Sequence, residues 1–180
     1  MTINAKLAIR PPEAADRGQW AALYLAFLGD VATAPARTEV SGRVWGWLLD
    51  PAHPLQGLVA DVGGGALAGL AHFSPKANPF RGRDIGFLDD LYVAEAHRRQ
   101  GVATSLLRAV LETTERAGWP VLRWLCGQDN AAGRALYDKI AGAPSHVVYG
   151  LPTGPRDAGF ADVDCTYKNG WFATFGGTRP

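Results

Sequence analysis

The sequence has few cysteines and no long apolar run. Only Cys126 and Cys165 occur among the 180 residues, and they lie far apart. This spacing excludes a disulfide scaffold and a CxxC metal or redox site, so both are expected to be reduced thiols. No stretch approaches the roughly 20 apolar residues of a membrane-spanning helix, and residues 1–10 lack the apolar segment of a secretion signal. We therefore expect a cytoplasmic protein with no membrane partner.

An excess of charge of either sign is also absent. Eighteen Lys and Arg residues oppose seventeen Asp and Glu residues, which leaves a formal net charge of +1. This balance lacks the broad basic footprint of phosphate-tracking proteins, so we expect no nucleic-acid partner. The histidines have no ligand spacing, and we interpret them as surface or hydrogen-bonded residues that bind no metal. These histidines are His53, His72, His97 and His146.

Hydrophobic residues make up 47% of the chain, which is enough for a globular core in a single domain spanning residues 1–180. Apolar periodicity predicts strands and helices in mixed order. The predicted strands cover residues 6–10, 57–62, 66–73, 85–93, 121–126 and 145–151, and the predicted helices cover 13–28, 39–49, 101–117 and 130–140. Three glycines at 63–65 predict a hairpin turn, and a polar loop is expected over 75–83. Two successive strand-to-helix units indicate parallel strands with covering helices.

The segment with the clearest chemical meaning is His-Arg-Arg-Gln-Gly-Val-Ala-Thr, which leads into a predicted helix. A helix start leaves backbone N–H groups unpaired and carries the positive end of the helix dipole, so it suits a phosphate. Gly101 and the small Ala103 let an anion approach the backbone, and Arg98 and Arg99 add charge-assisted bonds. The alternative is that the small residues allow close helix packing and the arginines are solvated.

The context of this segment resembles the GCN5-related N-acetyltransferase (GNAT) superfamily. Arg98-x-x-Gly101-x-Ala103 follows a strand ending in Leu-Tyr-Val and is similar to that superfamily's acyl-CoA pyrophosphate loop. Asn-Ala-Ala-Gly-Arg-Ala-Leu-Tyr, from Asn130 to Tyr137, resembles its later cofactor-contacting helix. The segments Phe-Leu-Asp-Asp-Leu-Tyr-Val, Trp-Leu-Cys-Gly-Gln-Asp-Asn and Leu-Tyr-Asp-Lys are similar to the diamine and Hpa2-type histone and polyamine acetyltransferase branch. Ala103 departs from the pattern, since a second glycine is usual there.

This resemblance implies an α/β (α+β) fold. Its central sheet is mixed, mostly antiparallel and twisted, with about six to seven strands that splay in the middle and about four flanking helices. The domain core is expected over residues 7–151, and residues 152–180 form a Gly-rich extension with a last strand predicted at 164–167. The resemblance also implies acetyl-CoA as co-substrate without a metal, and a homodimer is the expected assembly.

The resemblance implies where the co-substrate binds. Its pantetheine arm would pair with the backbone of one strand end, as an added peptide strand does, and its diphosphate would lie on the loop before the helix. The implied cofactor-binding residues are Leu91, Tyr92, Val93, Arg98, Arg99, Gln100, Gly101, Val102, Ala103, Thr104, Asn130 and Tyr137.

Acyl transfer to an amine needs an acid for the thiolate, a donor for the oxyanion and an uncharged nucleophile. The resemblance assigns the acid to Tyr137, because a phenol can protonate a thiolate. The oxyanion donor is expected to be the backbone N–H of Leu91 or Tyr92. Asp89 and Asp90 compete as general base, and on a regular strand only one of them would face the substrate. Asp89 is preferred, and the alternative is that both acids only bind a cationic substrate.

We therefore expect acetyl transfer from acetyl-CoA to a primary amine, by direct attack through a tetrahedral intermediate. Asp84, Asp89 and Asp90 concentrate negative charge in and just before the strand predicted at 85–93, which favours a polyamine-like or lysine-type amine. Two alternatives stay open at this point. One is a protein or peptide N-acetyltransferase, and the other is a non-catalytic acyl-CoA-binding sensor domain.

Overall fold

The computed structural model describes residues 7–29, 34–144, 163–168 and 172–177. The chain divides into two compact units, Met1–Gly142 and Ala143–Pro180. In the second unit, β6 (Val163–Lys168) pairs with β7 (Phe172–Gly177) as an antiparallel hairpin. This confirms the strand predicted at 164–167 and adds one that was not predicted, whereas the strand predicted at 145–151 falls outside the described residues. A single domain over residues 1–180 stays a prediction.

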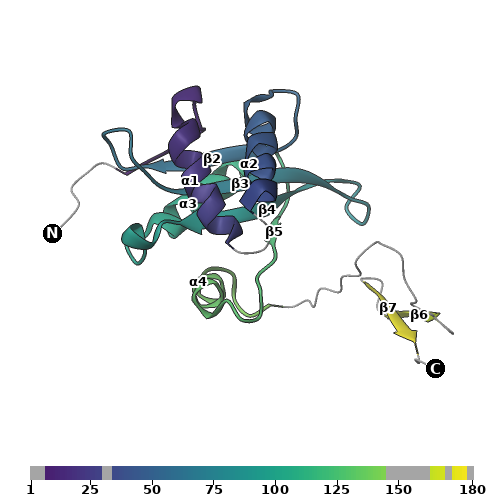
Figure 1. Ribbon diagram of the computed structural model, residues 1–180. Helices are drawn as coiled ribbons and strands as arrows, with labels where there is room; N and C mark the ends of the chain where they lie inside the picture. The colour runs from purple at the N-terminus through teal and green to yellow at the C-terminus, as the bar shows by residue number, and fades with distance from the viewer. Residues whose placement is uncertain (1–6, 30–33, 145–162, 169–171, 178–180) are drawn as a thin grey trace. The chain divides into compact units, whose positions relative to one another are not determined.

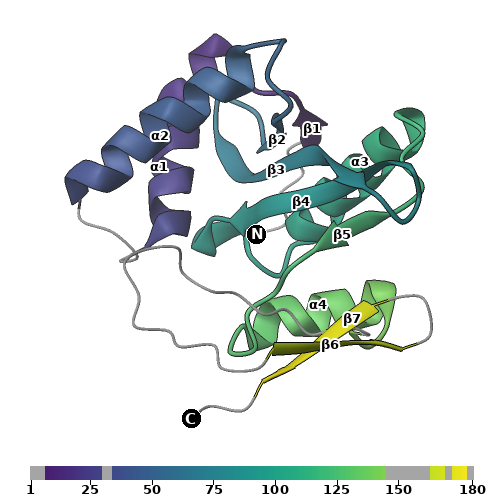
Figure 2. The same ribbon diagram turned by 90° about the vertical axis from the view of Figure 1, so that its right-hand side faces the viewer.

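The first unit is built on a five-stranded sheet in the order β1-β2-β3-β4-β5 (Figures 1 and 2). The strands are β1 (Ala8–Arg10), β2 (Gln56–Asp61), β3 (Leu67–Asn78), β4 (Arg83–Val93) and β5 (Leu122–Trp124). The sheet is mixed and mostly antiparallel, as predicted, although it has fewer strands than the six to seven expected. Only β4 and β5 run parallel, because a helical crossover joins them, whereas short turns join β2 to β3 and β3 to β4.

In the part of the chain that the structure describes, four α-helices accompany the sheet, as expected: α1 (Arg17–Leu28), α2 (Ala34–Leu49), α3 (Val102–Arg116) and α4 (Ala131–Ala141). A 3-10 turn at Ala14–Asp16 leads into α1, and another at Glu95–His97 precedes α3. Helix α2 begins five residues before its predicted start. Pro35 lies in the first turn of this helix. A backbone N–H there would have no acceptor within the helix, so the proline costs no hydrogen bond.

Strand β3 continues through Pro75 to Asn78, so the polar loop predicted over 75–83 is wrong and the turn shortens to residues 79–82. Pro75 is tolerated in the strand because β2 has already ended. The β2–β3 pairing stops at Gln56 opposite Phe73, and beyond it β3 has β4 as its only described neighbour. The proline therefore removes no donor that the sheet needs.

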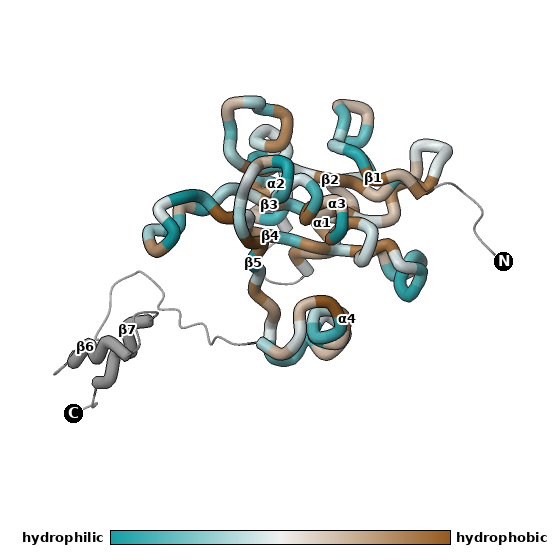
Figure 3. Tube along the Cα trace, turned by 180° about the vertical axis from the view of Figure 1, so that it is seen from behind, coloured by the Kyte–Doolittle hydropathy of each residue, from teal (hydrophilic) through white to brown (hydrophobic). Residues whose placement is uncertain are grey.

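Two apolar clusters hold the layers together, and Figure 3 shows apolar residues running along β1 and β2. On one face of the sheet, α3 buries Val102, Leu106 and Val110 against Phe73 and Leu88. On the other face, aromatic and aliphatic side chains of α1 and α2 form a cluster with residues of β2 and β3. Its buried members are Trp20, Leu23, Tyr24, Val44, Trp45, Val59, Leu67 and Leu70. Helices therefore cover both faces of the sheet, and Leu88 in the middle of β4 is buried on the α3 face.

Candidate active site

Strand β4 carries a bulge in its middle. Leu88 pairs with Phe73 and Asp90 pairs with His72, so Asp89 is an extra residue without a partner on β3. The extra residue shifts the alternation of side chains along the strand. The two carboxyl groups that follow Leu88 therefore do not obey the two-residue period of a regular strand.

Both carboxylates lie on the sheet face that α1 and α2 cover. The Asp90 carboxylate accepts a hydrogen bond from His72 Nδ1 at 2.8 Å, and Asp89 accepts one from the Ser74 hydroxyl at 2.8 Å. His72 and Ser74 are two residues apart on β3 and so share a face, and His72 contacts Trp20 of α1. The expectation that the two acids face opposite sides is wrong, and the bulge is the reason.

Asp84 does not join this pair. It lies opposite Ala77 close to the β3–β4 turn, five residues before Asp89, which is roughly 16 Å along an extended strand. The acidic cluster expected from the sequence therefore reduces to Asp89 and Asp90.

The surroundings of Asp89 make it a better proton acceptor than an ordinary carboxylate. Asp89 is exposed, but partial desolvation of its carboxyl still raises its pKa; the hydrogen bond from Ser74 opposes the rise, and the neighbouring charge of Asp90 adds to it. A raised pKa brings a carboxylate closer to the value at which a general base works best near neutral pH.

The sheet splays directly after the bulge. Strand β5 pairs with β4 only from Gly86 to Leu88, and no described strand covers the following edge of β4. The Ala94 N–H donates to the Ala68 carbonyl on β3 at 2.9 Å. By alternation the N–H of Leu91 points away from β3 to the open edge, as does that of Val93, whereas the Tyr92 N–H points to β3. An extended group can therefore pair with this edge.

The loop before α3 presents backbone N–H groups to open space. Gly101 has φ +83°, and a side chain built on it would meet nothing within 4 Å. Arg99 is also left-handed, with φ 62°. In the described part of the chain, none of the backbone N–H groups from Arg99 to Thr104 donates a hydrogen bond. The Val102 side chain is buried in the core, so this residue can contact an anion only through its backbone N–H. This loop has the features of an anion site at a helix start.

The two arginines of the loop differ in their contacts. The Arg98 Nε group donates to the Val93 carbonyl at 3.2 Å, and the guanidinium lies 5.9 Å from the centre of the Tyr92 ring. Arg98 thus ties the loop to the end of β4. Arg99 is exposed, and Gln100 bonds back to the Ala96 carbonyl.

Tyr137 of α4 packs against the same apolar cluster as Leu91 and Val93. Its ring centre lies 5.3 Å from that of Trp124 at the end of β5. Burial raises the pKa of Tyr137, and Cys126 adds to the rise. The phenol is therefore protonated at neutral pH, as a proton donor must be. The hydroxyl bonds to no other described residue.

Asn130 is the N-cap of α4, as predicted, and its Oδ1 accepts the Gly133 N–H at 2.9 Å. This bond gives Asn130 a structural role at the start of the helix that carries Tyr137. Its contact with the co-substrate stays a prediction.

Sequence reasoning missed three residues of this site, Trp20, His72 and Ser74. Each reaches the acids through strand pairing or helix packing, which no local pattern reports. The only signal was a histidine within an apolar strand segment; of the two interpretations left open for it, a surface residue or a hydrogen-bonded one, the structure shows the second.

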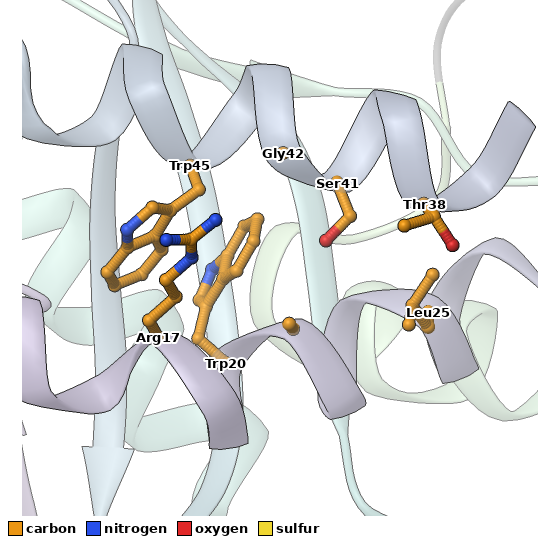
Figure 4. A pocket seen from close by; sticks show the side chains of 8 residues that line it. Arg17, Trp20, Leu25, Thr38, Ser41, Gly42 and Trp45 are labelled. Atoms are coloured by element: carbon orange, nitrogen blue, oxygen red, sulfur yellow. The ribbon is translucent and has the colours of Figure 1, made fainter. Parts of the chain in front are cut away.

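A pocket of about 150 Å³ lies between α1 and α2 (Figure 4). Its lining contains no carboxylate, so it is separate from the acid pair. The lining residues are Arg17, Trp20, Ala21, Leu25, Thr38, Ser41, Gly42 and Trp45.

Among the described residues, no three His, Cys, Asp or Glu side chains gather closely enough to hold a metal ion. No helix in the same residues has the length and apolarity needed to cross a membrane.

Comparison with known proteins gives a consistent result. A family model described as the acetyltransferase (GNAT) family matches residues 20–143. The D-amino-acid N-acetyltransferase HPA3 of Saccharomyces cerevisiae is 26% identical over 148 residues, which are 82% of this chain and 91% of the yeast protein.

Solved structures share the fold. A ribosomal-protein-alanine N-acetyltransferase from Brucella melitensis biovar Abortus 2308 superposes with a TM-score of 0.66 at 24% identity, covering 82% of this chain and 99% of that one. The aminoglycoside enzyme AAC(6')-Iy, bound to a bisubstrate analogue of CoA and acetylneamine, superposes with a TM-score of 0.67 at 17% identity, covering 83% and 99%.

Proposed function

The chain belongs to the acetyltransferase (GNAT) family, and from that premise we propose that it transfers an acetyl group from acetyl-CoA to a primary amine. One observation carries the proposal. A splayed strand edge, a helix-start loop rich in free N–H groups and a pair of carboxylates lie along one stretch of chain from Asp89 to Thr104. Together these features would hold CoA and place an amine beside its thioester, which is the positioning that acyl transfer depends on.

The loop from Arg98 to Thr104 would bind the diphosphate through its backbone N–H groups and through Arg99, which is exposed. The open edge of β4 would pair with the pantetheine arm. The Leu91 N–H points to this edge and would donate to the oxyanion, a role that the direction of the Tyr92 N–H disfavours.

The two carboxylates would act on the amine in different ways. An alkylamine is protonated near neutral pH and must lose a proton before it attacks. Asp89 would take that proton, directly or through a water, because its pKa is raised by partial desolvation. Asp90, held by His72, would attract and orient the ammonium group. Attack on the thioester carbonyl forms the C–N bond and a tetrahedral oxyanion, and collapse breaks the C–S bond while Tyr137 protonates the thiolate.

Replacing Asp89 with asparagine is expected to lower kcat roughly tenfold. This is less than the usual loss for a unique base, since Asp90 and water remain nearby. The ionised form of Asp89 is lost at a higher pH than that of an ordinary carboxyl, so the acid limb of the wild-type kcat profile should flatten in the variant. Release of CoA across the pH range measures both effects.

Asp84→Asn is the matched control, because it removes the same charge from the other end of the same strand. It should leave kcat and its pH profile unchanged. An equal loss of kcat in both variants would reject Asp89 as the base and leave only a general effect of net charge.

A free amino acid is a second candidate acceptor. The relative HPA3 is a D-amino-acid N-acetyltransferase, and such an acceptor needs a cation for its carboxylate. Lys76 is placed for this, since it lies two residues from Ser74 on the same face of β3, with its ammonium 4.8 Å from the centre of the Phe87 ring. Desolvation raises the pKa of Asp89, and the charge of Lys76 is the smallest of the effects that oppose that rise.

Replacing Lys76 with glutamine therefore separates the two acceptor classes. KM for a D-amino acid is expected to rise roughly three- to fivefold, which corresponds to the free energy of one exposed ion pair. KM for a diamine is expected to stay level or fall. Lys139→Gln on α4 is the control. A panel of diamines, lysine peptides, amino acids and aminoglycosides, assayed by CoA release, gives the reference values. An unchanged amino-acid KM would remove Lys76 from the site.

A further inference from the structure

A buried histidine links helix α1 to the acid pair. His72 lies in the middle of β3 with 0% of its surface exposed. Both ring nitrogens have partners: Trp20 Nε1 lies 3.0 Å from His72 Nε2, and His72 Nδ1 lies 2.8 Å from a carboxylate oxygen of Asp90. A chain of three side chains thus runs from the helix layer to the bulge of β4.

The chemistry of the indole determines the proton positions in this chain. An indole N–H can only donate, so His72 Nε2 must accept and carries no proton. The imidazole proton is therefore on Nδ1, which donates to Asp90. A second proton on Nε2 would point at the N–H of Trp20. The histidine can become a cation only if the Trp20 contact breaks.

Trp20 is held firmly in the place where it makes this bond. It is 1% exposed, and its ring stacks on Tyr24 at 5.0 Å and packs against Trp45 of α2 at 4.9 Å. Figure 4 shows the indoles of Trp20 and Trp45 side by side between the two helices. The packing of α1 on α2 therefore holds the Trp20 indole in place, and the indole in turn holds the His72 ring through its hydrogen bond to Nε2.

We propose that Trp20 and His72 are positioning residues that keep Asp90 a fixed, uncompensated anion for the ammonium group of the acceptor. This inference rests on the proposed function. The His72 bond occupies Oδ2 of Asp90, and no other described residue bonds to Oδ1, which is left for the substrate. By preventing a second proton on His72, Trp20 keeps the histidine from neutralising Asp90 when the pH falls.

The other ionisable groups around the pair are Tyr24 from α1, Asp89 from β4 and Lys76 from β3. Burial, with a smaller contribution from Asp90, raises the pKa of Tyr24 to about 12, so this phenol stays neutral through the test range. Asp89 and Lys76 are the same in all the variants below, so taking the ratio of variant to wild type at each pH removes their effect.

Trp20→Phe removes the indole N–H and keeps an aromatic ring. Without the indole N–H facing it, His72 Nε2 is free to accept a second proton. The ratio of variant to wild-type amine KM should rise roughly tenfold as the pH is lowered from about 8 to about 6, the size of one charge-assisted hydrogen bond. The matched control is Trp45→Phe, which makes the same change in a neighbouring ring that bonds to no histidine. A similar rise in both variants would overturn the proposal.

The histidine variants give a second test that does not depend on Trp20→Phe folding. In His72→Asn the amide N–H replaces the Nδ1 donor, so amine KM should stay within about threefold of wild type, whereas His72→Leu should raise it roughly tenfold at every pH. The double variant Trp20→Phe/His72→Asn should lose the pH-dependent rise, because asparagine does not ionise. A rise that persists there, or equal KM values for the Asn and Leu variants, would overturn the proposal.

A spectroscopic measurement separates this inference from the proposed function. Long-range ¹H–¹⁵N correlation spectra of ¹⁵N-histidine protein report which ring nitrogen carries the proton, and the missing signal in His72→Asn assigns His72. The expected result is a proton on Nδ1 and none on Nε2 in wild type at every pH tested, and a proton on Nε2 as well in Trp20→Phe at the lowest pH. A proton on Nε2 in wild type overturns the inference. The expected spectra together with no transfer to any amine would instead reject the proposed function.

Discussion

Tyr137→Phe is expected to lower kcat roughly 100-fold, because it removes the group that protonates the departing thiolate and keeps the ring. The half-buried ring packs against Trp124, so the variant should retain its fold and its affinity for acetyl-CoA. Pre-steady-state release of CoA and calorimetric titration of the co-substrate measure the two quantities separately.

The pH profile adds a check on the same residue. The phenol must be protonated to act as an acid, and its pKa is raised by burial, so wild-type activity should persist to alkaline pH before it falls. This alkaline fall should be absent from the variant. A fully active Phe variant, with the alkaline limb intact, would transfer the role to another group or to water.

Gly101→Leu is expected to weaken acetyl-CoA binding at least roughly 100-fold. The side chain would occupy the open space in front of the helix start, where the diphosphate would lie, and the backbone there is left-handed with φ +83°. Several charge-assisted bonds to the loop would be lost together. Calorimetric titration with acetyl-CoA measures the loss.

Gly118→Leu is the matched control for backbone strain. Gly118 also has a left-handed backbone, with φ +70°, and open space around it, and it lies just beyond the other end of α3. Both variants should lose a similar amount of stability in thermal unfolding, and only Gly101→Leu should lose affinity. Unchanged affinity in Gly101→Leu would reject the loop as the diphosphate site.

Features that depend only on neighbouring residues could be predicted from the amino-acid sequence. The Val102, Leu106 and Val110 spacing predicted α3, Asn130 predicted the start of α4, and the glycines at 63–65 predicted the β2–β3 turn. The family was also identified from local motifs at the start of α3 and in α4. Such patterns need no knowledge of what packs against them, because helix periodicity, capping and left-handed turns are local properties of the chain.

The arrangement of the two acids, in contrast, could not be predicted without the folded chain. A bulge is defined by the register between two strands, and the sequence around Asp89 reads as a regular strand until β3 is laid beside it. The same pairing brings His72, 18 residues away, to Asp90, and helix packing brings Trp20 to His72 across 52 residues. Because these contacts depend on register and packing, the face on which both carboxylates lie, and the fixed proton position beside them, arise only in the folded protein.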